Sequence, residues 1–339
     1  MIKTFRAMQT SSAGLLELVE RKMPVPGPDE VLIQIEACGV CGADLRDIER
    51  SQLNSESPRI PGHEIVGRIA EKGASVPSIW QDGQRVGVGR LGGHCQNCHS
   101  CREGLYHLCE NQLTPGLSCD GGYAEYVVIR HTALAAIPHE MSSVDAAPIL
   151  CAGTATFNAL RNSGAKAGDK VAIVGMGGLG HLAIQYARKM GFEVYVIARD
   201  PEKKLAAIEL GAHHFCPVSD RDGLKSLGRI DLMLVTAPDS ETVSALMTML
   251  APRGKAILLG TGASPVQIMP GMLIGAERSL VGSFVSTPAQ TERALRFSRI
   301  FEVLPTTQVM PLKQANEALA RLRQGKTRYR MVLTMAKDD

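Results

Sequence analysis

The sequence has few aromatic residues, no long apolar run and no large excess of charge of one sign. Phe, Trp and Tyr make up 4% of the residues, which disfavours stacking platforms for single-stranded nucleic acid. The net charge of +3 is too small for a phosphate-binding surface without a concentrated basic stripe, and the sequence has no such stripe. No segment reaches the roughly 18 apolar residues that a membrane span needs, and the N-terminus lacks the apolar core of a signal peptide. We therefore expect no nucleic-acid partner, no membrane partner and a cytoplasmic location.

Internal repeats and low-complexity tracts are also lacking. The 339 residues, of which 45% are hydrophobic and 21% charged, have a globular composition. At roughly 150 residues per domain they correspond to about two domains. Glycine is frequent, with 34 residues, and this predicts tight turns or a close approach of the backbone to a ligand.

The sequence does have nine cysteines, and they fall into two groups. In a cytoplasmic protein, cysteines are more often metal ligands, catalytic groups or core residues than disulfides. Four thiolates within fifteen positions can close the tetrahedral shell of a structural zinc ion, and the dense group is Cys95, Cys98, Cys101 and Cys109. Because four sulfurs already fill that shell, we expect the nearby His94, His99 and His107 to be surface loop residues.

A nucleic-acid-binding zinc ribbon also uses four cysteines, usually as two pairs about 15–20 residues apart. Here all four lie in one short lobe, residues 92–110, with no room for an intervening hairpin. This spacing counts against a nucleic-acid function.

The second group is dispersed along the chain. The segment CGVCGAD contains Cys38, Cys41 and Asp44, the segment PGHE contains His63 and Glu64, and Cys151 follows much later. A cysteine, a histidine and a second cysteine from distant segments match a catalytic zinc that keeps one position open. Glu64 is either a fourth ligand or a group that moves away to admit water or substrate. Asp44 is a candidate acceptor for the imidazole of the histidine, and Cys38 is expected to be a core thiol.

A glycine-rich turn follows the apolar run Val171–Val174 and precedes a helical pattern. A strand before this motif and a helix after it are the context of a dinucleotide-binding fingerprint. Its glycines let the backbone approach a pyrophosphate at the helix N-terminus. The candidate cofactor-binding residues of the turn are Gly175, Gly177, Gly178, Leu179 and Gly180.

The next predicted strand, 193–197, indicates which dinucleotide binds. An acidic residue at its end normally holds the ribose 2′-hydroxyl of NAD, but Ala198 occupies that position here. Arg199 and Lys203 could pair with a 2′-phosphate, so we favour NADP(H). In the alternative, Asp200 holds the ribose of NAD, and Arg199 and Lys203 are solvated charges.

Strand and helix patterns alternate beyond the turn. Strands are predicted at 230–235, 255–260 and 279–285, with a helix near 241–251, and alternating units of this kind imply a parallel sheet. The first 150 residues instead predict an irregular β-rich domain, with strands at 31–35 and 123–129 and few helix-length patterns. Helices at 289–299 and 312–324 and a strand at 328–334 are expected in the tail.

With these motifs in this order, the chain resembles the zinc-dependent medium-chain alcohol dehydrogenases over essentially its whole length. It looks closest to the NADP(H)-dependent cinnamyl-alcohol-dehydrogenase-like branch. The resemblance implies an α/β fold: a Rossmann doubly wound parallel sheet plus a GroES-like β-rich catalytic domain. The implied domains are residues 1–152 with the zinc lobe 92–110, residues 153–285 for the cofactor, and residues 286–339, which return to the catalytic domain.

The resemblance also assigns residues. It implies that Cys41 rather than Cys38 is the first ligand of the catalytic zinc, beside His63, Cys151 and the adjacent Glu64. Arg330 looks like the arginine that reaches the cofactor pyrophosphate, with the nearby Arg328 as the alternative. Two zinc ions per chain are therefore expected.

The chain departs from the family pattern at the proton relay. A Ser or Thr usually stands two residues after the ligand cysteine and takes the alcohol proton into a relay, but Ala43 stands here. The outer histidine of the relay is replaced by Arg46. The usual proton path is therefore broken, and the proton must move through water, a cofactor hydroxyl or another side chain.

The expected function is NADP(H)-linked interconversion of an alcohol and its aldehyde or ketone, with zinc polarising the substrate oxygen. Ala43 motivates one alternative, an NADPH-dependent reductase of an activated C=C bond. A second alternative is a non-catalytic homologue that binds zinc and dinucleotide. The resemblance implies a homodimer or homotetramer assembled through the sheet edge around 260–285.

Overall fold

The computed structural model describes residues 3–11, 15–53, 58–236, 240–260, 262 and 264–335. The chain divides into two units. Unit 1 comprises Met1–Thr154 and Val285–Asp339, and unit 2 comprises Ala155–Phe284. None of the helices in these described ranges has the length and apolar character required to cross a bilayer.

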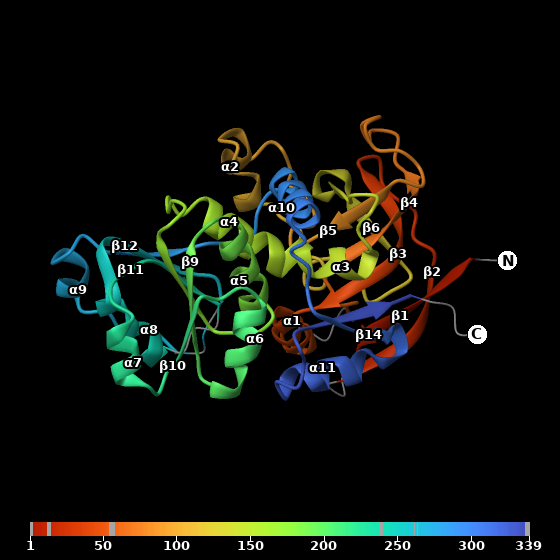
Figure 1. Ribbon diagram of the computed structural model, residues 1–339. Coiled ribbons are helices and arrows are strands. Elements are labelled where there is room, and N and C mark those ends of the chain that lie inside the picture. Colours follow the sequence, from red (N-terminus) through yellow and green to blue (C-terminus); the bar gives the residue numbers. More distant parts are fainter. Residues whose placement is uncertain are drawn as a thin grey trace. The chain divides into compact units, whose positions relative to one another are not determined.

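Unit 2 is built on a six-stranded sheet in the order β10-β9-β8-β11-β12-β13, and every pair in it is parallel (Figure 1). The strands are β8 (Lys170–Val174), β9 (Glu193–Ala198), β10 (His214–Pro217), β11 (Ile230–Val235), β12 (Leu250–Leu258) and β13 (Ser279–Gly282). After β10 the order reverses, and β11 pairs with β8 on the side opposite β9. With right-handed crossovers, this reversal places helices on both faces. The expected doubly wound sheet is confirmed.

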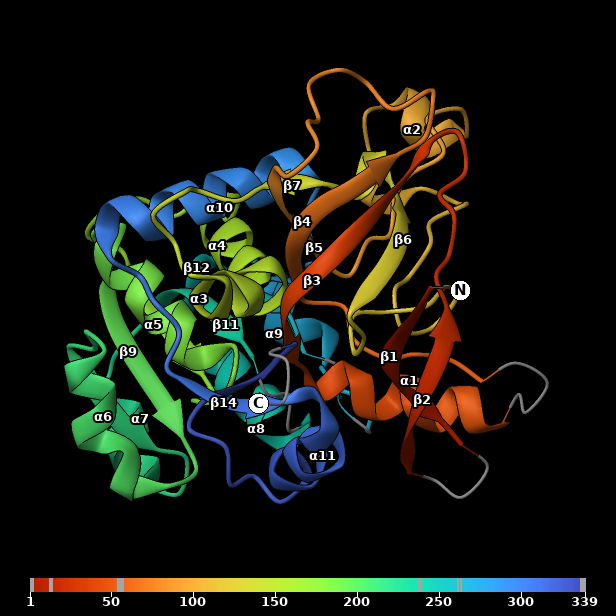
Figure 2. The same cartoon turned by 90° about the vertical axis from the view of Figure 1, so that its right-hand side faces the viewer.

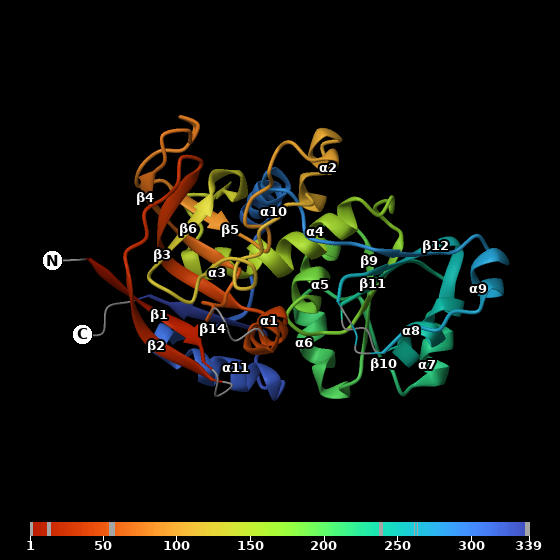
Figure 3. The same ribbon diagram turned by 180° about the vertical axis from the view of Figure 1, so that it is seen from behind.

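Helix α4 (Thr154–Arg161) precedes the first strand, and short helices connect the strands, as Figure 3 shows from behind. The connecting helices are α5 (Gly180–Lys189), α6 (Lys204–Glu209), α7 (Arg221–Ser226), α8 (Ser240–Leu246) and α9 (Pro270–Ile274). The helix expected near 241–251 is shorter, because Leu250 already pairs with Ile230 of β11 as the first residue of β12. In this segment, the pairing of β12 with β11 therefore outweighs the local preference for a helix.

Unit 1 contains a seven-stranded mixed sheet and a separate hairpin of β1 (Thr4–Thr10) and β2 (Leu16–Lys22). The sheet has the order β14-β15-β3-β4-β5-β7, with β6 also paired to β3 (Figure 2). Its strands are β3 (Glu30–Val40), β4 (Ile65–Lys72), β5 (Arg85–Val88), β6 (Tyr126–Arg130), β7 (Ala135–Ala136), β14 (Thr307–Pro311) and β15 (Arg330–Thr334). β15 is antiparallel to β3, with Leu333 opposite Cys38. The two ends of the chain thus build one sheet.

The helices of unit 1 include one that the sequence did not indicate, α1 (Gly42–Leu53). Its inward positions carry Asp44, Asp47 and Ile48, all of them buried. Because two of these three side chains are acidic, the apolar periodicity of a core-facing helix is hidden. The remaining helices are α2 (His99–Arg102), α3 (Ser143–Pro148), α10 (Pro288–Phe301) and α11 (Ala315–Arg323), with a π turn at Ile149–Gly153.

Candidate catalytic metal centre and cofactor turn

Four metal-ligating side chains meet inside unit 1. One ligand atom each from Cys41, His63, Glu64 and Cys151 lies within 4.8 Å of the other three. The side chains of His63 and Glu64 are fully buried, and Cys41 is nearly so. Among the described residues, neither Nε2 of His63 nor Oε2 of Glu64 has a hydrogen-bond partner. Buried polar atoms without a partner are costly, and a metal ion bound by this set would satisfy them, so the residues fit zinc.

Three separate segments bring these side chains together. Cys41 follows the end of β3, while His63 and Glu64 immediately precede β4. The two strands pair here, and the N–H of Gly39 donates to the carbonyl of Glu64 at 3.0 Å. A Cβ on Gly39 would lie 1.9 Å from Oε2 of Glu64, so glycine is required to make room for this carboxylate. Cys151 is supplied by the π turn, and π turns are frequent at functional sites.

Asp44 orients the imidazole of His63. Its Oδ1 lies 2.7 Å from Nδ1 of His63, and its Oδ2 accepts from the N–H of Cys41 at 2.8 Å and the hydroxyl of Tyr123 at 3.0 Å. A carboxylate on Nδ1 fixes the ring so that Nε2 faces the other ligands. This is the arrangement predicted for Asp44 as a partner of the histidine.

Electrostatics in the cluster favour a cation. Burial by itself would lower the pKa of His63, but the charge and hydrogen bond of Asp44 outweigh it and raise that pKa to about 10. A hydrogen bond from Cys151 lowers the pKa of Cys41 well below its usual value. A cluster that stabilises both a thiolate and a positive charge suits a metal ion.

Glu64 has an ion-pair partner from the far end of the chain. The guanidinium of Arg330, in β15, forms a buried salt bridge with Oε1 of Glu64. Burial raises the pKa of Glu64 to about 7, although the charge of Arg330 opposes that shift. Of the two arginines considered from the sequence, Arg330 lies at this cluster, whereas Arg328 is exposed. The contact of Arg330 with a cofactor pyrophosphate stays a prediction.

The four-cysteine lobe is a second, separate cluster, near α2 at the top of Figure 2. Cys95, Cys98, Cys101 and Cys109 each place a sulfur within 4.8 Å of the other three. The amide of Asn111 donates to Sγ of Cys95 at 3.4 Å, and this hydrogen bond lowers the pKa of Cys95 to about 6. Backbone hydrogen bonds, first from Cys101, lower the pKa of Cys98. Thiolates held by N–H donors suit a closed zinc shell.

The three histidines of the lobe lie outside this sulfur cluster. His99 is exposed, and His94 and His107 are half-buried. The ring of His94 packs 4.4 Å from that of Tyr106, centroid to centroid. Among the described residues, none of these three histidines belongs to a group that could hold a metal ion.

The glycine turn of unit 2 connects β8 to α5. Gly175 has a φ of +96°, a conformation that glycine adopts without strain. A Cβ on Gly180 would lie 2.1 Å from the carbonyl oxygen of Gly175, whereas one on Gly177 would meet nothing within 4 Å. Gly180 therefore permits close packing of the turn, and Gly177 leaves open space above it, as the pyrophosphate of a dinucleotide needs. Gly178 and Leu179 complete the turn before α5.

The residues after β9 differ in what they contact. The carboxylate of Asp200 accepts from the N–H of Glu202 at 3.0 Å and so caps the turn Pro201–Lys203. Nζ of Lys203 donates to the carbonyl of Met176 in the glycine turn at 3.2 Å. Arg199 is exposed. The ammonium of Lys203 thus lies at the glycine turn, while the exposed carboxylate of Asp200 caps the turn that follows it.

One charged pair that lies at the metal cluster was not predicted from the sequence. Arg90, just after β5, forms a bidentate salt bridge with Asp47 of α1. The guanidinium also lies 3.4 Å from Nδ1 of His63. The two residues are 43 positions apart, and no local motif joins them, so only the folded chain reveals the pair.

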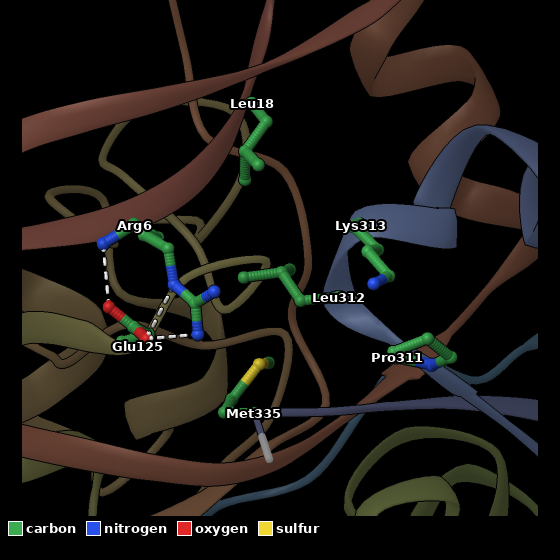
Figure 4. Close-up of a pocket in the computed structure, with 7 residues that line it drawn as sticks. All are labelled: Arg6, Leu18, Glu125, Pro311, Leu312, Lys313 and Met335. Carbon is green, nitrogen blue, oxygen red and sulfur yellow. Dashed lines mark hydrogen bonds and ion pairs between the residues drawn. The ribbon is translucent and has the colours of Figure 1, made fainter. Parts of the chain in front are cut away.

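Figure 4 shows a pocket of unit 1 whose lining residues include no cysteine and no histidine. The guanidinium of Arg6 lies 2.9 Å from the carboxylate of Glu125, and the other lining residues are Leu18, Pro311, Leu312, Lys313 and Met335. It shares no lining residue with either cysteine cluster. We do not assign it to the active site.

Two family models match the chain. Residues 27–139 match the family model of the alcohol dehydrogenase GroES-like domain, and residues 178–299 match that of the zinc-binding dehydrogenases. The alcohol dehydrogenase notN of Aspergillus sp. (strain MF297-2) is 38% identical over 323 residues, which is 94% of each chain. The chain belongs to the zinc-binding alcohol dehydrogenase family.

Solved structures of this family share the fold. A cinnamyl alcohol dehydrogenase of Sorghum bicolor superposes with a TM-score of 0.91 at 27% identity, covering 99% of each chain. The structure of CAD from Helicobacter pylori complexed with NADP(H) gives a TM-score of 0.86 at 26% identity, and the match covers 100% of each chain. The family prediction and the predicted fold class are confirmed, and the chain is an oxidoreductase of the alcohol dehydrogenase type.

Proposed function

We propose that this enzyme transfers a hydride between NADP(H) and an alcohol/aldehyde or alcohol/ketone pair at a zinc ion held by Cys41, His63 and Cys151. The observation that carries the proposal is the convergence of these side chains with Glu64 within 4.8 Å, with the imidazole fixed by Asp44. A second zinc ion in the lobe of Cys95, Cys98, Cys101 and Cys109 would be structural, since its four sulfurs leave no open position.

The chemistry divides between bound groups and protein. Zinc supplies a Lewis acid to the substrate oxygen, and the nicotinamide gives or takes the hydride. Asp44 holds His63 in the tautomer that binds metal. Glu64, paired with Arg330, is a buried carboxylate that can remain at the cluster or withdraw from it. Because residue 43 is alanine and residue 46 is arginine, neither position supplies the hydroxyl or imidazole of the usual relay.

We further propose NADP(H) rather than NAD as the cofactor. Three observations support this choice: Ala198 ends β9, Lys203 lies at the glycine turn, and the carboxylate of Asp200 caps its own turn. Arg199 would then pair with the 2′-phosphate. The solved relative from Helicobacter pylori was complexed with NADP(H). We keep Arg330 as the proposed contact to the pyrophosphate.

A homo-oligomer, dimer or tetramer, is proposed through the edge of the unit 2 sheet. β13 stands at the end of the strand order, and Val281, Phe284 and the neighbouring Ile274 are exposed. Exposed apolar groups on an edge strand favour pairing with a second copy. Residues 261 and 263 of the expected segment lie outside the described residues. A cytoplasmic location is also proposed, and the nine free cysteines are consistent with it.

One experiment tests the proposed activity. Purified enzyme is assayed with NADPH and with NADH against aldehydes, ketones and α,β-unsaturated aldehydes, with products identified and zinc measured on the same sample. We expect alcohols as products, a preference for NADPH and about two zinc ions per chain. Saturated aldehydes without alcohol would instead identify a C=C reductase. Absence of hydride transfer together with an empty Cys41 cluster would identify a non-catalytic homologue.

A further inference from the structure

A pocket in unit 1 adjoins the metal cluster. It is lined by Arg90, Leu91, Leu150, Ser286 and Thr291, among others. Leu150 directly precedes the ligand Cys151, and Arg90 lies 3.4 Å from the imidazole of His63. The pocket therefore begins one side chain away from the proposed zinc ligands. If the oxygen of a substrate reaches the metal, the substituents nearest that oxygen would lie beside this pocket.

Arg90 is the one charged side chain among the described residues that line this pocket. Its side chain is 17% exposed, whereas that of Asp47 is only 3% exposed. Arg90 lines the pocket and its side chain keeps some exposure, whereas Asp47 is not a lining residue and its carboxylate is almost fully buried. The rest of the wall is uncharged and largely apolar: Leu91, Ala133 and Leu150 are buried there, and only Ser286 and Thr291 add hydroxyl groups.

The salt bridge leaves part of the guanidinium available. A guanidinium has five N–H donors in a rigid fork, and the two-pronged pair with Asp47 uses one from each terminal nitrogen. The contact with Nδ1 of His63 does not use another, because that nitrogen already donates to Asp44. The hydrogen bonds to Asp47 hold the fork in one orientation, so little rotamer entropy is lost when a ligand binds.

The charges around Arg90 decide what kind of ligand suits it. Asp47 neutralises Arg90, Arg330 neutralises Glu64, and Asp44 adds a further carboxylate. Zinc with two thiolates carries no net charge either. The surroundings therefore have no surplus positive charge with which to hold a carboxylate, whereas N–H donors in an apolar wall favour an uncharged oxygen acceptor.

We propose that Arg90, held by Asp47, is a specificity-determining residue whose N–H groups bind an uncharged second oxygen of the substrate. The enzyme then favours carbonyl compounds that carry a hydroxyl or a second carbonyl next to the reacting group. This inference rests on the proposed alcohol dehydrogenase activity and names a substrate class for it.

The test compares substrates that differ only in the group facing Arg90. Propanal is compared with glycolaldehyde and glyoxylate, and butanone with hydroxyacetone and pyruvate. For the unmodified enzyme we expect kcat/KM for the hydroxyl compounds to exceed that for the methyl compounds about tenfold or more. The carboxylates should show no such gain.

Variants connect this preference to the salt bridge. In the double variant Arg90→Met with Asp47→Asn, which leaves no unpaired buried carboxylate, the ratio of kcat/KM for the hydroxyl compounds to that for the methyl compounds should fall to about one, whatever happens to the turnover of propanal itself. Arg90→Lys should lose most of the preference, because an ammonium lacks the fork. The matched control replaces the Arg6 and Glu125 pair of Figure 4 with Met and Gln, and should keep the preference.

Binding without turnover gives an independent measurement. Glycolamide and propanamide mimic the two aldehydes but are not reduced, and calorimetry gives their dissociation constants for the enzyme with NADPH. We expect tighter binding of glycolamide, lost in the double variant. Equal kcat/KM for methyl and hydroxyl compounds, a preference that survives in the double variant, or a carboxylate preference would overturn the inference. Failure of the proposed function itself would appear differently, as no turnover of any carbonyl compound by the unmodified enzyme.

Discussion

The four-cysteine lobe and the Cys41 cluster both gather cysteine sulfur, but in opposite settings. The lobe takes its four ligands from fifteen consecutive positions, and its sulfurs receive hydrogen bonds from a short loop. The Cys41 cluster takes its residues from three segments, the first and last of which are more than a hundred positions apart, and two salt bridges lie beside these buried residues. A local shell can close around a metal by itself, whereas the dispersed cluster exists only after unit 1 has folded. We therefore expect loss of the lobe to affect stability and loss of the cluster to affect catalysis.

The largest effect should come from a ligand of the dispersed cluster. In Cys41→Ala we expect kcat/KM to fall about a thousandfold or more, because several kcal/mol of transition-state stabilisation depend on the metal. Steady-state kinetics with metal analysis checks this, and the variant should lose one of its two zinc ions. The matched control is Cys38→Ala, a buried cysteine of β3 outside the cluster. Equal losses in both variants would contradict the ligand assignment.

A ligand of the lobe should behave in the reverse way. In Cys98→Ala we expect the Tm to fall by about 10 °C, because a structural metal contributes folding free energy directly. The kcat/KM per mole of folded protein should change only a few-fold. Calorimetry and kinetics on one preparation measure both quantities, with Cys119→Ala as control. A large loss of kcat/KM at an unchanged Tm would remove the distinction between the two sites.

We expect an intermediate effect when Asp44, whose carboxylate contacts the imidazole of His63, is replaced. Asp44→Asn should lower zinc affinity or kcat/KM about 10–100-fold, since the partner of a ligating imidazole sets its orientation. Zinc competition with a chelator and steady-state kinetics provide the measurement. Glu49→Gln, an exposed carboxylate on the same helix α1, should leave both values unchanged. If the two variants behave alike, Asp44 does not orient His63.

The smallest effect concerns the missing relay hydroxyl beside the cluster. Ala43→Thr places a hydroxyl two residues after Cys41, and we expect a few-fold change in aldehyde turnover with an altered pH profile, because a proton donor is added. Ala43→Val, of similar shape but without the hydroxyl, is the control. An unchanged rate and pH profile would mean that the proton does not move along this side of the site.

The same contrast explains what could be predicted from sequence. The four-cysteine lobe could be predicted because its cysteines lie close together in the sequence. The glycine turn could be predicted because a strand pattern and a helix pattern flank it. The choice of Cys41 over Cys38 needed the family resemblance, since both lie in one short segment. The pairs Glu64–Arg330 and Asp47–Arg90 join residues 266 and 43 positions apart. No periodicity encodes such contacts, because they arise only when β15 and α1 pack beside the cluster.

Anomalous X-ray scattering at the zinc edge, on crystals of the enzyme with NADPH, tests the central claim most directly. The account predicts two zinc peaks per chain. One should lie about 2.0–2.3 Å from Nε2 of His63 and from the sulfurs of Cys41 and Cys151, and the other should lie among the four sulfurs of the lobe. A single peak confined to the lobe, with Cys41 and Cys151 turned away from each other, would contradict it.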